Sequence, residues 1–386
     1  MDEIIESPLV EYLHCKADAT GIPLSGTFEL TPCCNMDCRM CYVRLSEEEV
    51  KRQGRLRTTE EWIRLAEDAK NEGMLFLLLT GGEPFIRKDF KELYEAFRQM
   101  GLVISINSNA TLLDEKWVSW LEQRRPARMN VTLYGASDET YKRLCRNPKG
   151  FTQVTAALKR LKEAEIPVKL NCSLTPYNIG DMEEIQKFAI ENEYPIETAV
   201  YMFPPIRKTN NCKNTMSQDS ILSCSNNRFN PKETALATIR LELLRNGEEA
   251  FREHCEKILK GQSSELTRAD RCFAEGQEIQ CRAGGCSFWI TWDGRMLPCG
   301  LMPRPVMEPF RDGFSKSWLQ LKEEVKKIRL PIQCAECKDQ ELCHTCAAMI
   351  YAETGDFKEV PKYRCELVEE YKKACKKAVS EVADDE

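Results

Sequence analysis

The chain has 386 residues, of which 42% are hydrophobic and 30% are charged, and its 55 basic and 61 acidic residues leave a net charge of −6. This composition is typical of a globular protein and excludes an electrostatic nucleic-acid binder. No apolar run approaches the ~20 residues of a membrane span. The acidic first residues differ from the basic start of a signal peptide, so we expect a cytoplasmic protein.

The first half of the chain alternates between predicted strands and helices. Thr58 and Glu61 form a capping box, and Trp62, Leu65 and Ala66 recur after it at helical spacing. The alternation predicts an α/β fold with a parallel sheet wrapped by helices, in which six units fit better than eight. The expected strands cover 26–31, 74–79, 103–107, 129–133, 168–173 and 198–202, with one of the helices over 154–164.

The pattern fails over 204–232, where Pro, Asn, Ser and Lys dominate, and this stretch is predicted to be a linker or a lid. A helical segment over 233–260 leads into a cysteine-rich region. We therefore expect three parts: a core domain over 1–205, a linker with a bridging helix over 206–275, and a C-terminal domain over 276–386.

The 20 cysteines are the unusual feature of the composition. A reducing cytosol does not favour disulfides in a chain of this size, so metal ligation is the better interpretation. One tight set near the N-terminus consists of Cys34, Cys38 and Cys41. A loop of this spacing can place three thiolates around one four-iron cluster and leave the fourth iron open to a substrate. A zinc knuckle with a fourth ligand close by is the alternative.

A second motif, Gly81-Gly82-Glu83-Pro84, ends an apolar strand about 40 residues later. Its glycines would let the backbone approach a ligand, and Glu83 could bind an ammonium group. Together the two motifs resemble the radical S-adenosylmethionine (SAM) superfamily, as does Tyr42 directly after Cys41. The resemblance implies a partial (βα)6 TIM-like barrel. In it one 4Fe-4S cluster would bind SAM at its open iron and cleave it reductively to a 5′-deoxyadenosyl radical.

The resemblance also implies SAM contacts from later strands. Thr132 would meet the carboxylate or the ribose of SAM, and Arg146 would clamp the carboxylate, with an ordinary surface arginine as an equal alternative. Asn171 and Ser173 lie on the fifth strand and face one end of the sheet by alternation, which ordinary strand polarity also explains. No catalytic acid or base is singled out. The full set assigned to SAM is Gly81, Gly82, Glu83, Pro84, Ser108, Thr132, Arg146, Asn171 and Ser173.

The C-terminal cysteines resemble the SPASM extension of enzymes that mature peptides and proteins, which implies two auxiliary 4Fe-4S clusters and three clusters in all. Asp293-Gly294, a hairpin signal, precedes one of these cysteines. Two zinc sites are the alternative. By resemblance, Cys281, Cys286, Cys299 and Cys346 would hold the first auxiliary cluster, and Cys334, Cys337, Cys343 and Cys365 the second.

The extension implies an enzyme that abstracts hydrogen from a peptide or protein. The product would be a thioether or carbon–carbon crosslink, an epimerised centre or an oxidised side chain. Only 33 residues precede Cys34, too few for a leader-binding domain. A separate leader-binding protein is therefore a candidate partner, besides an external electron donor such as flavodoxin or ferredoxin.

Three alternatives are kept open. One is a dehydrogenase of a small alcohol or sugar. Another is an enzyme like the anaerobic sulfatase-maturing ones, which is disfavoured because Gly300 stands where those enzymes place an aspartate. The last is an iron–sulfur electron-transfer or assembly protein. The turn at Gly81–Pro84 argues against it, because an electron carrier needs no SAM pocket.

Overall fold

A single curved sheet forms the centre of the computed structural model, which describes residues 7–204, 227–261, 279 and 281–380. Its strand order is β6-β5-β4-β3-β2-β1-β7-β8. Strands β1 to β6 and β7 are all parallel, and β8 is antiparallel to β7. The strands are β1 (Ser25–Glu29), β2 (Phe76–Thr80), β3 (Val103–Ser108), β4 (Arg128–Thr132), β5 (Val168–Ser173), β6 (Ile196–Ala199), β7 (Ser287–Ile290) and β8 (Met296–Leu297).

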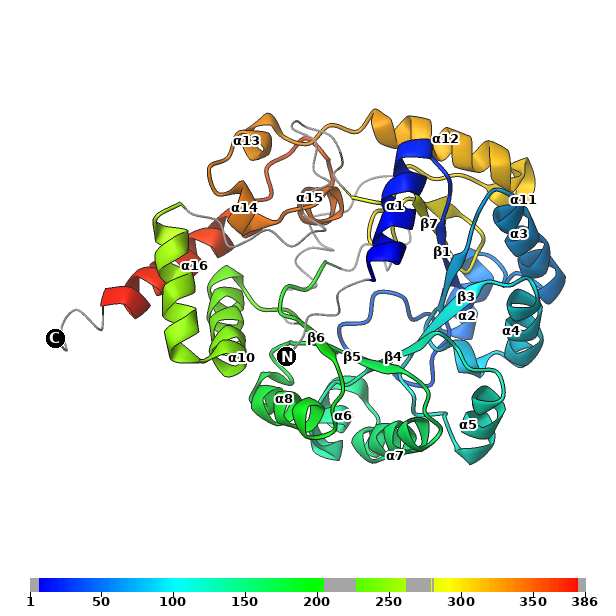
Figure 1. Ribbon diagram of the computed structural model, residues 1–386, viewed down its shortest axis with the longest axis horizontal. Coiled ribbons are helices and arrows are strands. Elements are labelled where there is room, and N and C mark those ends of the chain that lie inside the picture. The colour runs from blue at the N-terminus through cyan, green and yellow to red at the C-terminus, as the bar shows by residue number, and fades with distance from the viewer. Residues whose placement is uncertain (1–6, 205–226, 262–278, 280, 381–386) are drawn as a thin grey trace.

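The sheet does not close, because β6 and β8 end the strand order on opposite sides. Helices follow each of the first five strands and lie along the outside of the sheet (Figure 1). This arrangement confirms the predicted partial (βα)6 barrel. The helices of this half are α1 (Pro8–Thr20), α2 (Glu47–Gln53), α3 (Thr59–Asn71), α4 (Phe90–Gln99), α5 (Glu115–Glu122), α6 (Asp138–Cys145), α7 (Gly150–Glu163) and α8 (Met182–Glu191), with the short helices η1 (Pro84–Ile86) and η2 (Ile179–Asp181).

Local signals in the sequence account for several of these elements. Thr58 and Glu61 cap α3 reciprocally, and Trp62, Leu65 and Ala66 form its buried face. The predicted strand over 198–202 begins and ends earlier, at Ile196–Ala199. The burial pattern shows that β1 to β5 supply apolar residues to one core cluster shared with the surrounding helices.

The C-terminal half contributes both to the sheet and to a separate group of helices. Strand β7 pairs with β1, and Phe288 packs against Phe28 with ring centroids 6.5 Å apart. The hairpin predicted at Asp293-Gly294 joins β7 to β8. The remaining helices are α10 (Pro231–Leu259), α11 (Pro309–Asp312), α12 (Phe314–Lys326), α13 (Ile332–Ala335), α14 (Gln340–Cys343), α15 (Ala347–Thr354) and α16 (Lys362–Ser380).

Helices α10 and α16 pack side by side at one end of the molecule (Figure 1). The predicted helix over 233–260 corresponds to α10, which Gly247 interrupts with a left-handed backbone at φ 81°. Residues 206–226 and 262–275 of the predicted linker lie outside the described residues. None of the described helices is both long and apolar enough to cross a membrane.

Candidate active site

The loop with the first three cysteines follows β1 and lies at the carboxyl edge of the sheet. Its backbone is fixed on the end of α6, where Asp37 N donates to Cys145 O at 3.1 Å and Arg39 N donates to Leu144 O at 3.0 Å. These two bonds flank Cys38, which is 8% exposed. In parallel α/β folds ligands bind at this edge, because the loops after the strands meet there.

The thiols of Cys34, Cys38 and Cys41 lie within electrostatic reach of one another. Burial, helped by the nearby carboxylate of Glu83 and by the other two thiols, raises the pKa of Cys34 to about 12. Closely spaced thiolates repel one another, and bound iron would relieve this repulsion because its positive charge takes the place of their protons. The chemistry of this donor set therefore fits an iron–sulfur cluster.

Hydrogen-bond donors already point at two of these sulfurs. Met36 N lies 3.4 Å from Cys34 Sγ, Arg44 N lies 3.3 Å from Cys41 Sγ, and Asn109 Nδ2 lies 3.6 Å from Cys34 Sγ. Donors to ligand sulfurs orient the ligands and tune the reduction potential of a cluster. Sequence reasoning did not single out Asn109, although it directly follows Ser108 at the end of β3.

Cys145, which the sequence left without an assignment, contacts Cys38. It is fully buried at the end of α6, and its hydrogen bond with Cys38, together with burial, raises the pKa of the Cys38 thiol. This contact depends on the docking of the cysteine loop on α6. No spacing between the two residues in the sequence signals it.

The glycine turn holds the segment that leads into the cysteine loop. Gly82 N donates to Thr31 O at 2.7 Å, and Glu83 N donates to Cys33 O at 2.9 Å. A Cβ atom on Gly81 would lie 2.4 Å from Thr31 O, and one on Gly82 would lie 2.3 Å from Cys33 O. The two glycines thus lie against the protein's own backbone, and this contact leaves no room for a side chain at either position. Their predicted approach to a ligand stays a prediction.

Glu83 has different partners from the ammonium group that the sequence suggested. Its carboxylate is fully buried and accepts hydrogen bonds from Phe85 N at 3.2 Å, Ser108 Oγ at 2.9 Å and Asn109 N at 2.8 Å. Burial raises the pKa of Glu83 to about 7, and these three donors oppose the shift. Glu83 therefore ties the turn after β2 to the end of β3.

Replacing Glu83 by alanine should destabilise the metal-free protein by roughly 3 kcal/mol, because it leaves three buried donors without an acceptor. Urea denaturation followed by circular dichroism would measure the change. Glu92→Ala is the matched control, since Glu92 is exposed in the first turn of α4. A loss for Glu83→Ala no larger than that of the control would contradict this structural role.

The other residues assigned to SAM lie along neighbouring strand ends. Pro84 begins η1 beside the turn, and Ser108 ends β3 with its hydroxyl on Glu83. Thr132 and Asn171 are partners in register on β4 and β5. Ser173 ends β5. The structure thus brings these residues to the same edge of the sheet as the cysteine loop, and their contact with SAM stays a prediction.

Arg146 is placed against the cysteine loop. It ends α6 in the left-handed conformation, and its guanidinium lies 2.5 Å from Asp37 Oδ2, with 59% of the side chain exposed. Arg44 lies 3.1 Å from the other oxygen of Asp37. Arg146 therefore helps to fix the loop on α6. Its predicted contact with the carboxylate of SAM stays a prediction.

The C-terminal cysteines form two spatial groups. In the first, burial together with the nearby thiols of Cys346 and Cys299 raises the pKa of Cys281 to about 11. Cys286 is fully buried and interacts electrostatically with Cys281, and also with Cys15, which the sequence left unassigned. Cys281 therefore lies near each of the other three predicted ligands of the first auxiliary cluster.

The second group contains the other four predicted ligands. Burial raises the pKa of Cys334 to about 11, and the thiols of Cys365, Cys343 and Cys337 add to the shift. Cys365 likewise interacts with Cys343 and Cys337. Within the described part of the chain, no three Cys, His, Asp or Glu side chains converge closely enough to hold one single metal ion, whereas in a four-iron cluster each cysteine binds a different iron.

A buried carboxylate that sequence reasoning missed lies at the end of β1. Glu29 is 1% exposed and accepts a hydrogen bond from Trp289 Nε1 at 3.0 Å. The Trp289 ring also covers Gly300, where an added Cβ would lie 2.8 Å from three ring atoms. The sequence did contain a signal for this residue, because Glu29 is the one charged residue in the strand Ser25–Glu29. Gly300 is required because the indole fills the space of a side chain.

Comparison with known proteins places these features in a family. Residues 28–189 match the model of the radical SAM superfamily. The chain is 26% identical over 355 residues to the AdoMet-dependent heme synthase of Methanosarcina barkeri, covering 89% of this chain and 97% of that protein. It is 25% identical over 183 residues to the PqqA peptide cyclase of Bradyrhizobium diazoefficiens, covering 47% of each.

Two solved structures share the fold over nearly the whole chain. Native anSMEcpe with bound AdoMet and Kp18Cys peptide superposes with a TM-score of 0.64 at 19% identity, covering 94% of this chain and 100% of that one. Streptococcus suis SuiB bound to the precursor peptide SuiA gives 0.62 at 17% identity, covering 95% and 83%. The family match begins at Phe28 in β1, runs through β5 and includes the loop with the three cysteines, so this part of the chain is a radical SAM domain.

Proposed function

We propose that this enzyme cleaves SAM at a cluster held by Cys34, Cys38 and Cys41 and abstracts hydrogen from a peptide or protein substrate. When bound, the cluster and SAM supply a 5′-deoxyadenosyl radical. The observation that carries the proposal is the convergence of the three thiols with the glycine turn at the carboxyl edge, together with two further cysteine groups in the C-terminal half.

The residues of the chain have distinct tasks in this proposal. The turn at Gly81–Glu83 holds the segment before the cysteine loop, and Asp37 and Arg146 fix the loop on α6. Thr132, Asn171 and Ser173 offer polar groups to SAM at the adjoining strand ends. The two C-terminal groups would hold two auxiliary 4Fe-4S clusters, with an external flavodoxin or ferredoxin as electron donor.

A peptide substrate is favoured by three relatives. The PqqA peptide cyclase acts on a peptide, and anSMEcpe and SuiB have been solved with peptides bound. The reaction of anaerobic sulfatase-maturing enzymes stays disfavoured, because Trp289 fills the space beside Gly300 where an aspartate would be needed.

A second candidate is a small-molecule reaction on a haem precursor. It is favoured by the similarity to the heme synthase, which extends over 89% of this chain and 97% of that protein, whereas the peptide cyclase matches over 47% of each. In this case no leader-binding partner is needed, and the radical would act on the haem precursor.

The test is formation of 5′-deoxyadenosine by the anaerobically reconstituted and reduced protein, measured by mass spectrometry. SAM should be cleaved, and cleavage should increase with the true substrate class. Synthetic peptides and iron-containing haem precursors would be compared in parallel. Absence of 5′-deoxyadenosine in strictly anaerobic, iron-loaded samples would instead indicate an electron-transfer or assembly protein.

Changing Cys334 and Cys365 together to alanine should remove about four irons from the reconstituted protein, since each cluster carries four. Production of 5′-deoxyadenosine from SAM alone should persist, because the first cysteine loop is intact. Cys255→Ala is the control, since this buried cysteine packs between α10 and α16. Mass spectrometry of the metals gives the contrary outcome. If the wild type contains zinc that the double variant lacks, and both contain the same iron, the second auxiliary cluster is refuted.

A further inference from the structure

A cavity of about 530 Å³ lies between β6, the helices α10 and α16, and the loop after Cys337. None of the residues assigned to SAM or to the clusters lines it. Thr198 of β6 faces this side of the sheet, because its hydroxyl accepts a hydrogen bond from Gln186 of α8 at 2.9 Å. The cavity therefore opens toward the helices and is separate from the edge that carries the cysteine loop.

Two guanidinium groups in the wall have only neutral hydrogen-bond partners. Arg364 is 8% exposed and donates to Thr345 Oγ1 at 3.2 Å and to the carbonyl oxygen of Cys343. Arg245 donates to Gln186 Oε1 at 3.2 Å and to Thr198 Oγ1 at 3.0 Å. Neither arginine forms an ion pair with a carboxylate among the described residues, although Glu242 and Glu197 interact electrostatically with the exposed Arg245.

The charges of the wall favour an anion. Arg245, Lys338 and Arg364 outnumber the two carboxylates of the wall, so the wall is net positive when the histidines are neutral. One carboxylate, Asp339, already pairs with Lys372 at 2.7 Å. The other, Glu242, accepts a hydrogen bond from the Tyr371 hydroxyl.

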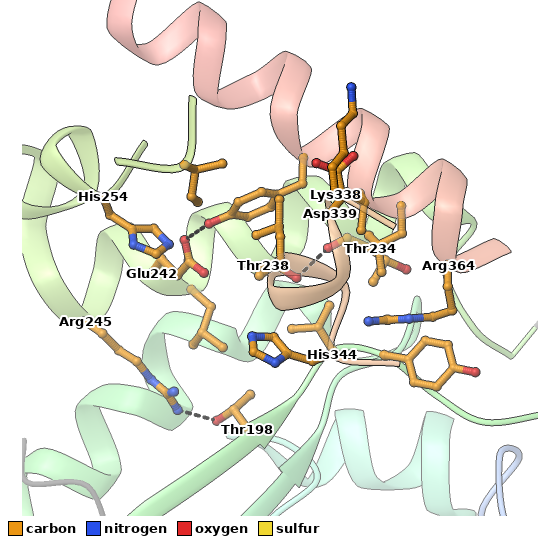
Figure 2. A pocket seen from close by; sticks show the side chains of 18 of the residues that line it. Thr198, Thr234, Thr238, Glu242, Arg245, His254, Lys338, Asp339, His344 and Arg364 are labelled. Carbon is orange, nitrogen blue, oxygen red and sulfur yellow. Dashed lines mark hydrogen bonds between the residues drawn. The ribbon is translucent and has the colours of Figure 1, made fainter. Parts of the chain in front are cut away.

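Charged and apolar side chains both line the cavity. Figure 2 shows Glu242, Arg245, His254 and His344 arranged around its centre, with Arg364 at one side. Six apolar side chains also line the cavity and would hold a hydrocarbon part of a ligand. These apolar side chains are Val200, Leu241, Ile258, Leu342, Leu367 and Val368.

We propose that this cavity binds a small amphiphilic monocarboxylate, with its carboxylate on Arg245 and its apolar part between α10 and α16. A planar guanidinium matches a carboxylate with two parallel hydrogen bonds, which makes arginine the suitable partner. The occupant would contact Leu342 and His344, on either side of Cys343. The site would therefore place a metabolite beside the second cysteine group.

The test is calorimetric titration of the full-length reconstituted protein with octanoate at pH 7.5. Octanoate should bind, and octan-1-ol, which has the same chain without the charge, should bind at least tenfold more weakly. Equal binding of the alcohol would mean a merely apolar cavity, and no binding of octanoate would mean no site. Either result would overturn the proposal.

Variants locate the binding. Arg245→Gln should weaken octanoate binding about tenfold, the loss of one charge-assisted pair, and Arg245→Lys should restore part of it. Arg240→Gln is the matched control, because Arg240 lies on the same helix but pairs with Glu183 at 2.5 Å, outside the cavity. The same affinity for Arg245→Gln and the control, in proteins with unchanged melting temperatures, would refute the assignment of the carboxylate.

Discussion

Replacing Cys34, Cys38 and Cys41 together by alanine should abolish formation of 5′-deoxyadenosine. It should also lower the iron content of the reconstituted protein from about twelve to about eight, by four irons for one cluster. The physical reason is that thiolates are the ligands of such a cluster and that these three lie together at the carboxyl edge of the sheet. Iron and sulfide assays, with mass spectrometry of the nucleoside, would measure both effects.

Cys33→Ala is the control for this variant. Cys33 neighbours Cys34 in the sequence but packs against Leu45, Val50 and Trp292. It should retain all the iron and the cleavage of SAM. If the wild type binds about four irons and the triple variant binds none, the SAM-cleaving cluster is supported, but the proposal of auxiliary clusters loses its support. Cleavage that survives in the triple variant would refute the cluster site itself.

Gly82→Ala should prevent loading of the SAM-binding cluster, although it adds one methyl group. The new Cβ would lie 2.3 Å from Cys33 O and 2.7 Å from Pro32 O. Both are backbone atoms, and the hydrogen bond from Glu83 N to Cys33 O at 2.9 Å prevents a simple shift. Overpacking of this kind costs about 1–3 kcal/mol. The cost would be relieved by displacing the segment that leads into Cys34.

The matched control is Gly180→Ala, because an added Cβ at Gly180 in η2 meets nothing within 4 Å. Gly82→Ala should bind about four fewer irons than the wild type while keeping the C-terminal clusters, and Gly180→Ala should bind the full number. Iron content and thermal melting of the two variants, measured side by side, decide the matter. Equal iron in both would mean that the turn does not hold the loop.

The sequence by itself determined the features that depend on short spacings. Strand and helix alternation predicted the parallel sheet, and the capping box at Thr58 and Glu61 predicted the start of α3, because these signals act within a few residues. The spacing of Cys34, Cys38 and Cys41 likewise predicted an iron–sulfur site, because ligand type and loop length limit what a loop can bind.

The tertiary structure alone decided which distant residues meet. It brought Cys145 onto Cys38, joined the Glu83 carboxylate to Ser108 and Asn109, and placed β7 beside β1. It also formed the cavity beside Arg245. Such contacts join segments far apart in the chain. They depend on how whole strands and helices pack, which no local pattern of residues encodes.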